Sequence, residues 1–158
     1  MNSKTKSTLL LVLLTITFII CSTLVLAISF KTSEFNVVYA AEPSAASSFA
    51  GGTGTSDDPY LISTAEQLIK FRNYVNSSSS NTTACAKLIA DITFTGTNNW
   101  NTPIGIMSTN YRGTFDGNYH TITGLNYQGN AVNTEFGLFG YINDGSKIVN
   151  LTLSNIAK

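Results

Sequence analysis

The spacing of apolar and polar residues predicts one helix in the first half of the domain that follows residue 50. Apolar residues recur at the i, i+3 and i+7 positions of a single helical face, at Leu68, Phe71 and Val75. Ser63 with Glu66, or Thr64 with Gln67 one residue later, supplies a capping box at its start. The pattern therefore predicts an amphipathic helix over residues 64–76, ended by the polar Ser/Asn run that follows.

After this helix, short β-rich runs alternate with Gly, Asn and Asp. The runs cover residues 87–94, 102–106, 111–116, 120–127, 136–142 and 146–156. Three segments share apolar residues at their first, fourth and sixth positions, and they begin at Ile89, Ile122 and Ile148. The tripeptides 113–115 and 137–139 repeat a second pattern, in which Gly is followed two residues later by Phe.

Repeats of this kind are typical of stacked units, because one short unit cannot bury its own apolar face. The aligned apolar residues would then point inward, and the capped helix would cover the N-terminal end. A small β-sandwich produces similar alternation and stays open as an alternative. The sequence predicts an all-β fold in either case.

The N-terminal segment has the pattern of an export signal. Lys4 and Lys6 precede an uncharged, largely apolar run over residues 8–30, and small residues precede a cleavage position after Ala40. The run is longer than the ~7–15 residues usual in a signal peptide and long enough for a membrane span of ~20 residues. Residues 1–40 are therefore interpreted as a signal peptide or an N-terminal membrane anchor. Both interpretations place the remainder outside the cytoplasm.

The exported part carries little charge. The whole chain has 9 Lys+Arg and 9 Asp+Glu. Beyond residue 40 there are 6 basic and 8 acidic residues, a balance of −2. Nucleic-acid binding needs a basic surface, so nucleic acid is excluded as a partner. A membrane is expected as a partner only through residues 8–30, if they are not cleaved.

Cys85 is the one cysteine beyond the N-terminal segment, and it lies in an apolar stretch. A lone cysteine forms no intramolecular disulfide, so the domain is not a disulfide scaffold. We expect a small buried hydrophobic residue here rather than a nucleophile.

An ordered set of short motifs resembles the GLUG-repeat family of bacterial surface proteins. Gly137, Leu138, Phe139 and Gly140 resemble the motif that gives the family its name. The flanking motifs are GT at 54–55, DPYLI at 58–62, TAEQL at 64–68, ADI at 90–92, PIG at 103–105, YRGTFDG at 111–117 and IVNL at 148–151. The resemblance covers residues 51–156.

This resemblance implies a short right-handed parallel β-helix with an N-terminal capping α-helix, on the surface of a Gram-positive-type bacterium. Related regions occur in adhesin-like proteins and in N-terminal parts of immunoglobulin-A-cleaving metallopeptidases. The resulting domain organisation is residues 1–40 for export or anchoring, 41–50 as a tether, and 51–158 as a GLUG-type domain. Relatives continue for many further repeats, so the last domain is expected to be truncated at its C-terminus.

A few side chains are candidates for ligand binding. Arg112, Asp116 and His120 are spaced by four, and Trp100 and Tyr119 could offer aromatic faces to sugars. The set formed by Arg112, Asp116 and His120 lacks the second carboxylate and the Lys that a polysaccharide lyase site would need. We expect a turn at residues 116–118 as the plainer explanation of that spacing.

The sequence thus predicts a secreted or cell-surface structural or adhesive module without catalysis, cofactor or metal. Its expected partners are host or cell-wall glycans or surface proteins. The alternatives are a carbohydrate-binding module and a fragment of a polysaccharide lyase or hydrolase.

Overall fold

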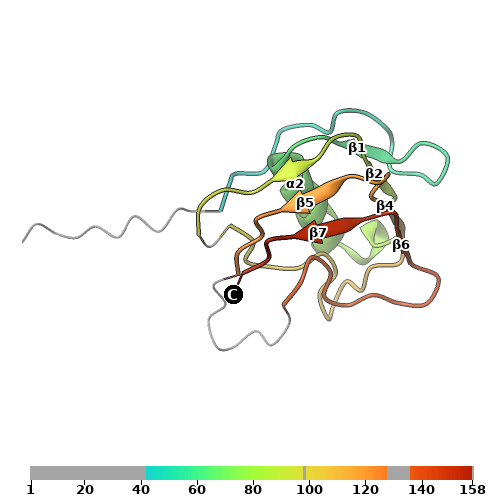
Figure 1. The fold of residues 1–158 in the computed structure, drawn as a ribbon. Coiled ribbons are helices and arrows are strands. Elements are labelled where there is room, and N and C mark those ends of the chain that lie inside the picture. Colours follow the sequence, from blue (N-terminus) through green and yellow to red (C-terminus); the bar gives the residue numbers. More distant parts are fainter. Residues whose placement is uncertain (1–41, 98, 128–135, 158) are drawn as a thin grey trace, which may run out of the picture. The chain divides into compact units, whose positions relative to one another are not determined.

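A computed structural model describes residues 42–97, 99–127 and 136–157. The predicted export or anchor segment, residues 1–40, lies outside the described residues. The elements, in chain order, are β1 (Tyr60–Ile62), α2 (Ala65–Ser77), the 3₁₀ turn η1 (Ser79–Asn81), β2 (Ala86–Leu88), β3 (Ile92–Thr93), β4 (Thr114–Asp116), β5 (Thr121–Thr123), β6 (Lys147–Val149) and β7 (Thr152–Ser154) (Figure 1). No helix among the described residues has the length and apolarity that a membrane crossing requires.

The strands form two parallel sheets. One contains four strands in the order β1-β2-β4-β6, and the other contains three in the order β3-β5-β7. Figure 1 shows β5 and β7 running side by side in the same direction. Parallel neighbours need a connection that returns the chain to the same end of the sheet, which explains why strands close in space lie about 30 residues apart in sequence.

The register of these strands differs from the repeat alignment predicted from the sequence. Ile122 pairs with Ile92 rather than Ile89, and with Leu153 rather than Ile148. Ile148 instead pairs with Phe115 in the other sheet. The predicted alignment is therefore wrong by three to five residues, because the shared apolar pattern aligned residues that do not occupy equivalent strands; the residues that pair with Ile122 are 30 and 31 positions from it.

The predicted helix is confirmed, with its first residue at Ala65 and its last at Ser77. Thr64 caps it, and its hydroxyl accepts a hydrogen bond from the Gln67 N–H at 3.3 Å. The chain leaves the helix at Ser78, which has an extended backbone. The apolar residues that predicted the helix, Leu68, Phe71 and Val75, are fully buried.

The helix forms part of the core rather than a cover over its end. The Phe71 ring packs 6.1 Å from the Tyr111 ring and 5.9 Å from the Phe115 ring, measured between centroids. Leu68, Ile69 and Val75 belong to the same buried cluster. The expectation of an all-β protein, a short right-handed parallel β-helix with a capping α-helix, is therefore wrong. The described chain is an α/β mixture of two parallel sheets and one helix, in which no strand exceeds three residues.

The motif at residues 137–140 is a packing element of this core. Leu138 is buried, and the Phe139 ring lies 5.4 Å from both the Tyr111 and Phe115 rings. A side chain at Gly140 would place its Cβ 2.7 Å from the Gly105 carbonyl oxygen. Glycine is therefore required at this position by the close approach of two backbone segments.

The segment predicted as a tether also contacts the domain. The Phe49 ring stacks on Tyr60 at a centroid distance of 4.1 Å. The Ala46 N–H donates a hydrogen bond to the Glu66 carbonyl at 3.0 Å. The described residues 42–50 thus lie against β1 and α2.

Candidate functional site

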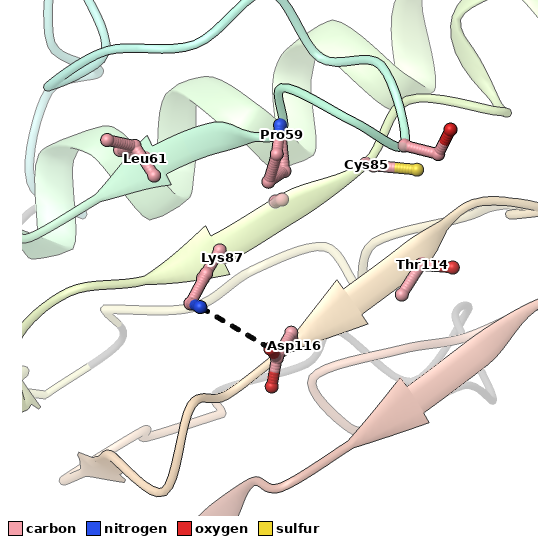
Figure 2. A pocket seen from close by; sticks show the side chains of 8 residues that line it. Pro59, Leu61, Cys85, Lys87, Thr114 and Asp116 are labelled. Carbon is pink, nitrogen blue, oxygen red and sulfur yellow. Dashed lines mark ion pairs between the residues drawn. The ribbon is translucent and has the colours of Figure 1, made fainter.

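The outer face of the four-stranded sheet carries a groove with paired charges. Side chains alternate between the two faces of a strand, so the neighbours of buried core residues point outward. Leu61, Lys87 and Asp116 are in register on β1, β2 and β4. They line a cavity of about 390 Å³, together with Ser56, Pro59, Cys85, Ala86 and Thr114. Figure 2 shows the labelled side chains on three adjacent strands and the turn before β1.

A salt bridge crosses this groove. The Lys87 Nζ lies 4.0 Å from the Asp116 Oδ2, and both side chains are partly exposed (Figure 2). Exposed pairs at this distance add little to stability, typically below about 1 kcal/mol. The Lys87 ammonium and the Asp116 carboxylate therefore lie side by side as a hydrogen-bond donor and acceptor, and both remain available to a ligand.

Asp116 is held as a carboxylate by its neighbours. Partial burial by itself raises the pKa of Asp116, but the Asn150 and Asn118 hydrogen bonds and the Lys87 charge outweigh it and lower the pKa overall. Its Oδ1 accepts from the Asn118 N–H at 2.8 Å and from the Asn150 Nδ2 at 3.0 Å. The other oxygen, Oδ2, faces Lys87 and the groove.

Cys85 lines the groove but is itself buried, as the sequence predicts. Its thiol donates a weak hydrogen bond to the Thr83 carbonyl at 3.7 Å. Cys85 lines the groove together with the apolar side chains of Pro59 and Leu61.

The three candidates spaced by four do not form one group. Asp116 pairs with Lys87, whereas the His120 Nδ1 lies 3.0 Å from the Asp91 Oδ1. Arg112 is exposed and lines a different cavity. Each of the three predicted residues thus has different surroundings.

Asp91, which pairs with His120, is a surface carboxylate with a lowered pKa. The hydrogen bond from the Thr121 N–H, 2.9 Å from Oδ1, is the largest cause, followed by the hydrogen bond with His120. Among described residues, no three His, Cys, Asp or Glu side chains gather in a way that would hold a metal ion.

Tyr119 lies at the tip of a tight turn. The His120 N–H donates to the Gly117 carbonyl at 2.8 Å, and Asn118 and Tyr119 both have positive φ angles, 48° and 65°. This is the pattern of a type I′ turn over residues 117–120, which begins one residue later than the turn predicted at 116–118. The Tyr119 side chain is 84% exposed.

Trp100 lies in the core and not on the surface. Its side chain is fully buried, its Nε1–H donates to the Gly137 carbonyl at 3.1 Å, and the Arg72 guanidinium lies 4.8 Å from its ring centroid. The prediction that Trp100 offers a ring face to sugars is therefore wrong. The buried ring instead joins the α2 helix to the 137–140 motif.

Sequence reasoning missed Lys87 and Asp91. Lys87 carried a signal, because a single charge between two apolar residues of a strand indicates an outward position. Asp91 carried none, since its pairing with His120 depends on the parallel register of β3 and β5.

No protein-family model matches the chain, and no solved structure does. Two proteins of known sequence are similar to it. A protein described as a Gly-rich membrane protein, from Evansella cellulosilytica, is 35% identical over 111 residues, which is 67% of this chain and 12% of the relative. Halomucin from Haloquadratum walsbyi is 37% identical over 106 residues, which is 65% of this chain and 1% of that protein. The chain thus spans a small part of each relative.

Proposed function

We propose that the described domain is a glycan-binding module of a surface- or membrane-associated protein. The groove between β1 and β4 is the observation that carries this proposal. The names of the two relatives, a membrane protein and halomucin, support the location. The resemblance to GLUG-repeat proteins and the export pattern of residues 1–40 are consistent with it.

The chemistry of the groove favours a neutral sugar. Leu61 and Pro59 provide apolar surface for the C–H face of a sugar ring. The Lys87 ammonium donates to hydroxyl groups and the Asp116 carboxylate accepts from them. Because the two charges balance, the groove has no net attraction for an anion or a cation. The partners are host or cell-wall glycans that present neutral sugars.

Binding rather than catalysis fits the dispersed positions of Arg112, Asp116 and His120. A general acid and a general base must both reach one substrate bond. Here Asp116 faces Lys87 while His120 faces Asp91. The module is therefore proposed to hold its ligand without transforming it.

Protease treatment of intact cells tests the proposed location. The full chain, carrying a C-terminal epitope tag, is expressed in a Gram-positive bacterium and exposed to an external protease. We expect loss of the tag in wild type and protection in Leu13→Arg, which interrupts the apolar segment 8–30. Equal protection of both proteins would contradict export. Sequencing of the mature N-terminus distinguishes cleavage after Ala40 from retention as an anchor.

Calorimetric titration with neutral oligosaccharides tests the groove. The full chain is purified in mild detergent and titrated with chitotriose and maltotriose. Removing a hydrogen bond to a charged group costs about 1.5–3 kcal/mol, so Lys87→Gln and Asp116→Asn should each weaken binding by about tenfold or more. Arg112→Gln removes one charge outside the groove and should bind as wild type does. Absence of binding to both sugars, or equal affinity in all variants, would overturn the proposal.

A further inference from the structure

A second cavity, separate from the groove, lies beside Arg112. It has a volume of about 230 Å³ and is formed by three chain segments. Ser79 is the first residue of η1 and Thr82 directly follows η1, Ser108 and Thr109 come from the loop after residue 106, and Arg112 precedes β4. A water molecule occupies about 30 Å³ of liquid, so the cavity is large enough for a sugar-sized molecule.

The backbone holds these segments together. The Arg112 N–H donates to the Thr82 carbonyl at 2.8 Å, and the Thr109 N–H donates to the Ile106 carbonyl at 2.9 Å. The Thr82 hydroxyl donates to the Ser79 carbonyl at 2.8 Å. The positions of the lining groups are thus set by hydrogen bonds within the protein.

Arg112 supplies an unpaired positive charge to this cavity. Within the described part of the chain, its guanidinium has no carboxylate or carbonyl partner, in contrast to Arg72, which pairs with Glu42. A guanidinium is always protonated in proteins, and its planar fork matches the two oxygens of a carboxylate. The cavity therefore attracts an anion.

Thr109 supplies a second, independent indication of a ligand. Thr109 is 7% exposed, and its hydroxyl is a buried polar atom with no hydrogen-bond partner in the protein. Buried polar atoms are nearly always paired, so an unpaired one calls for an explanation. Thr109 and Arg112 line the same cavity, and a rotation of the Thr109 side chain about χ1 would bring the hydroxyl, which is closed off in this rotamer, to a ligand there.

We propose that the Arg112 cavity binds the carboxylate of a sugar acid. The two parallel N–H groups of the guanidinium match the two oxygens of a carboxylate. The hydroxyls of Ser79 and Ser108 can donate to and accept from the hydroxyls of a sugar ring, whereas the Thr82 hydroxyl already donates to the Ser79 carbonyl. This site does not depend on the groove, so it holds whether or not the groove binds a neutral glycan.

The test compares two ligands that differ in one group. Glucuronate and glucose are titrated into the full chain in mild detergent, and binding is followed by saturation-transfer NMR of the sugar protons. Because the groove is itself proposed to bind neutral sugars, the comparison is made in Lys87→Gln, in which glucuronate should bind at least tenfold more tightly than glucose. Arg112→Gln should lose that difference, and Arg112→Lys, which keeps the charge but not the fork, should recover part of it. Lys147→Gln removes the same charge from the exposed strand β6, outside both cavities, and should leave glucuronate binding unchanged.

Thr109→Val separates a binding role from a structural one. The substitution removes only a hydroxyl that has no partner in the protein, so the thermal midpoint should stay the same or rise. Glucuronate binding should fall about threefold to tenfold. Weaker glucuronate binding in a variant with an unchanged thermal midpoint would show that the Thr109 hydroxyl contacts the ligand and does not stabilise the fold.

Several results would overturn this proposal. Equal affinity for glucuronate and glucose would show that the site does not recognise the carboxylate. Unchanged glucuronate binding by Arg112→Gln would show that Arg112 does not bind the ligand. Competition by inorganic sulfate at the same concentration as glucuronate would show that the site binds anions without specificity for a sugar acid. Loss of glucuronate binding in Lys87→Gln alone would move the ligand to the groove.

Discussion

Replacing Phe71 by Ala tests whether α2 belongs to the core. Phe71 is fully buried, and its ring packs against the rings of Tyr111, Phe115 and Phe49, at centroid distances of 6.1, 5.9 and 6.5 Å. These contacts join the helix to β4 and to the segment before β1. Truncation to Ala leaves a cavity where the helix meets the sheet.

The expected loss is large compared with the stability of a small domain. Phe→Ala in a core costs about 3–5 kcal/mol, from lost burial and the cavity left behind. Domains of this size have free energies of unfolding of about 5–15 kcal/mol. With a urea dependence of about 2 kcal/mol per molar, a loss of about 4 kcal/mol lowers the unfolding midpoint by about 2 M.

Fluorescence of the one tryptophan, Trp100, reports this transition. Its ring is buried beside Arg72, so unfolding exposes it to water. The full chain is unfolded in urea in mild detergent. Tyr74→Ala is the matched control, since Tyr74 lies on the same helix and is 36% exposed. A loss below about 1 kcal/mol for Phe71→Ala, or one no larger than that of the control, would refute the assignment of α2 to the core.

Three further predictions concern the turns and the surface carboxylates. Tyr119→Gly should raise stability by up to about 1 kcal/mol, because glycine adopts the positive φ of this turn without strain; a loss measured in the same urea assay would contradict this. Gly113→Ala should lower stability by about 1–3 kcal/mol, since the new Cβ would lie 2.1 Å from the Ala84 carbonyl oxygen; an unchanged urea midpoint would refute that contact. Folding lowers the pKa of Asp91 below its ordinary value of 3.8, so its contribution to stability is present above that pH and is lost as the pH falls through the folded value. Asp91→Asn should therefore make stability less sensitive to pH below 4, and identical acid profiles for the two proteins would contradict the hydrogen bonds of Asp91 with the Thr121 N–H and His120.

Local patterns in the sequence predict the local features of the fold. The helix could be predicted because its apolar spacing and its cap involve residues within one or two turns of each other. A turn after β4 could be predicted for the same reason, from Gly and Asn in adjacent positions. The helix is confirmed, and so is the presence of a turn, which lies one residue later than predicted, at residues 117–120.

Pairings between distant segments could not be predicted in this way. The register of β5 places Ile122 beside Ile92 and Leu153, and it depends on the lengths and paths of the connections between strands. The groove follows from that register, because Lys87 and Asp116 meet only when β2 and β4 pair as they do. Trp100 is an aromatic residue in a polar stretch of sequence, and its burial depends on Arg72 and on Gly137.

NMR mapping of ligand binding tests the proposed glycan site most directly. Backbone amide shifts of the full chain in detergent micelles are recorded while the neutral sugar chitotriose is added. We predict that the perturbed amides cluster at residues 56–61, 85–87 and 114–116, which surround the groove, and that Lys87→Gln abolishes the shifts. Shifts confined to other surfaces, or none at concentrations that saturate ordinary sugar-binding sites, would contradict the account.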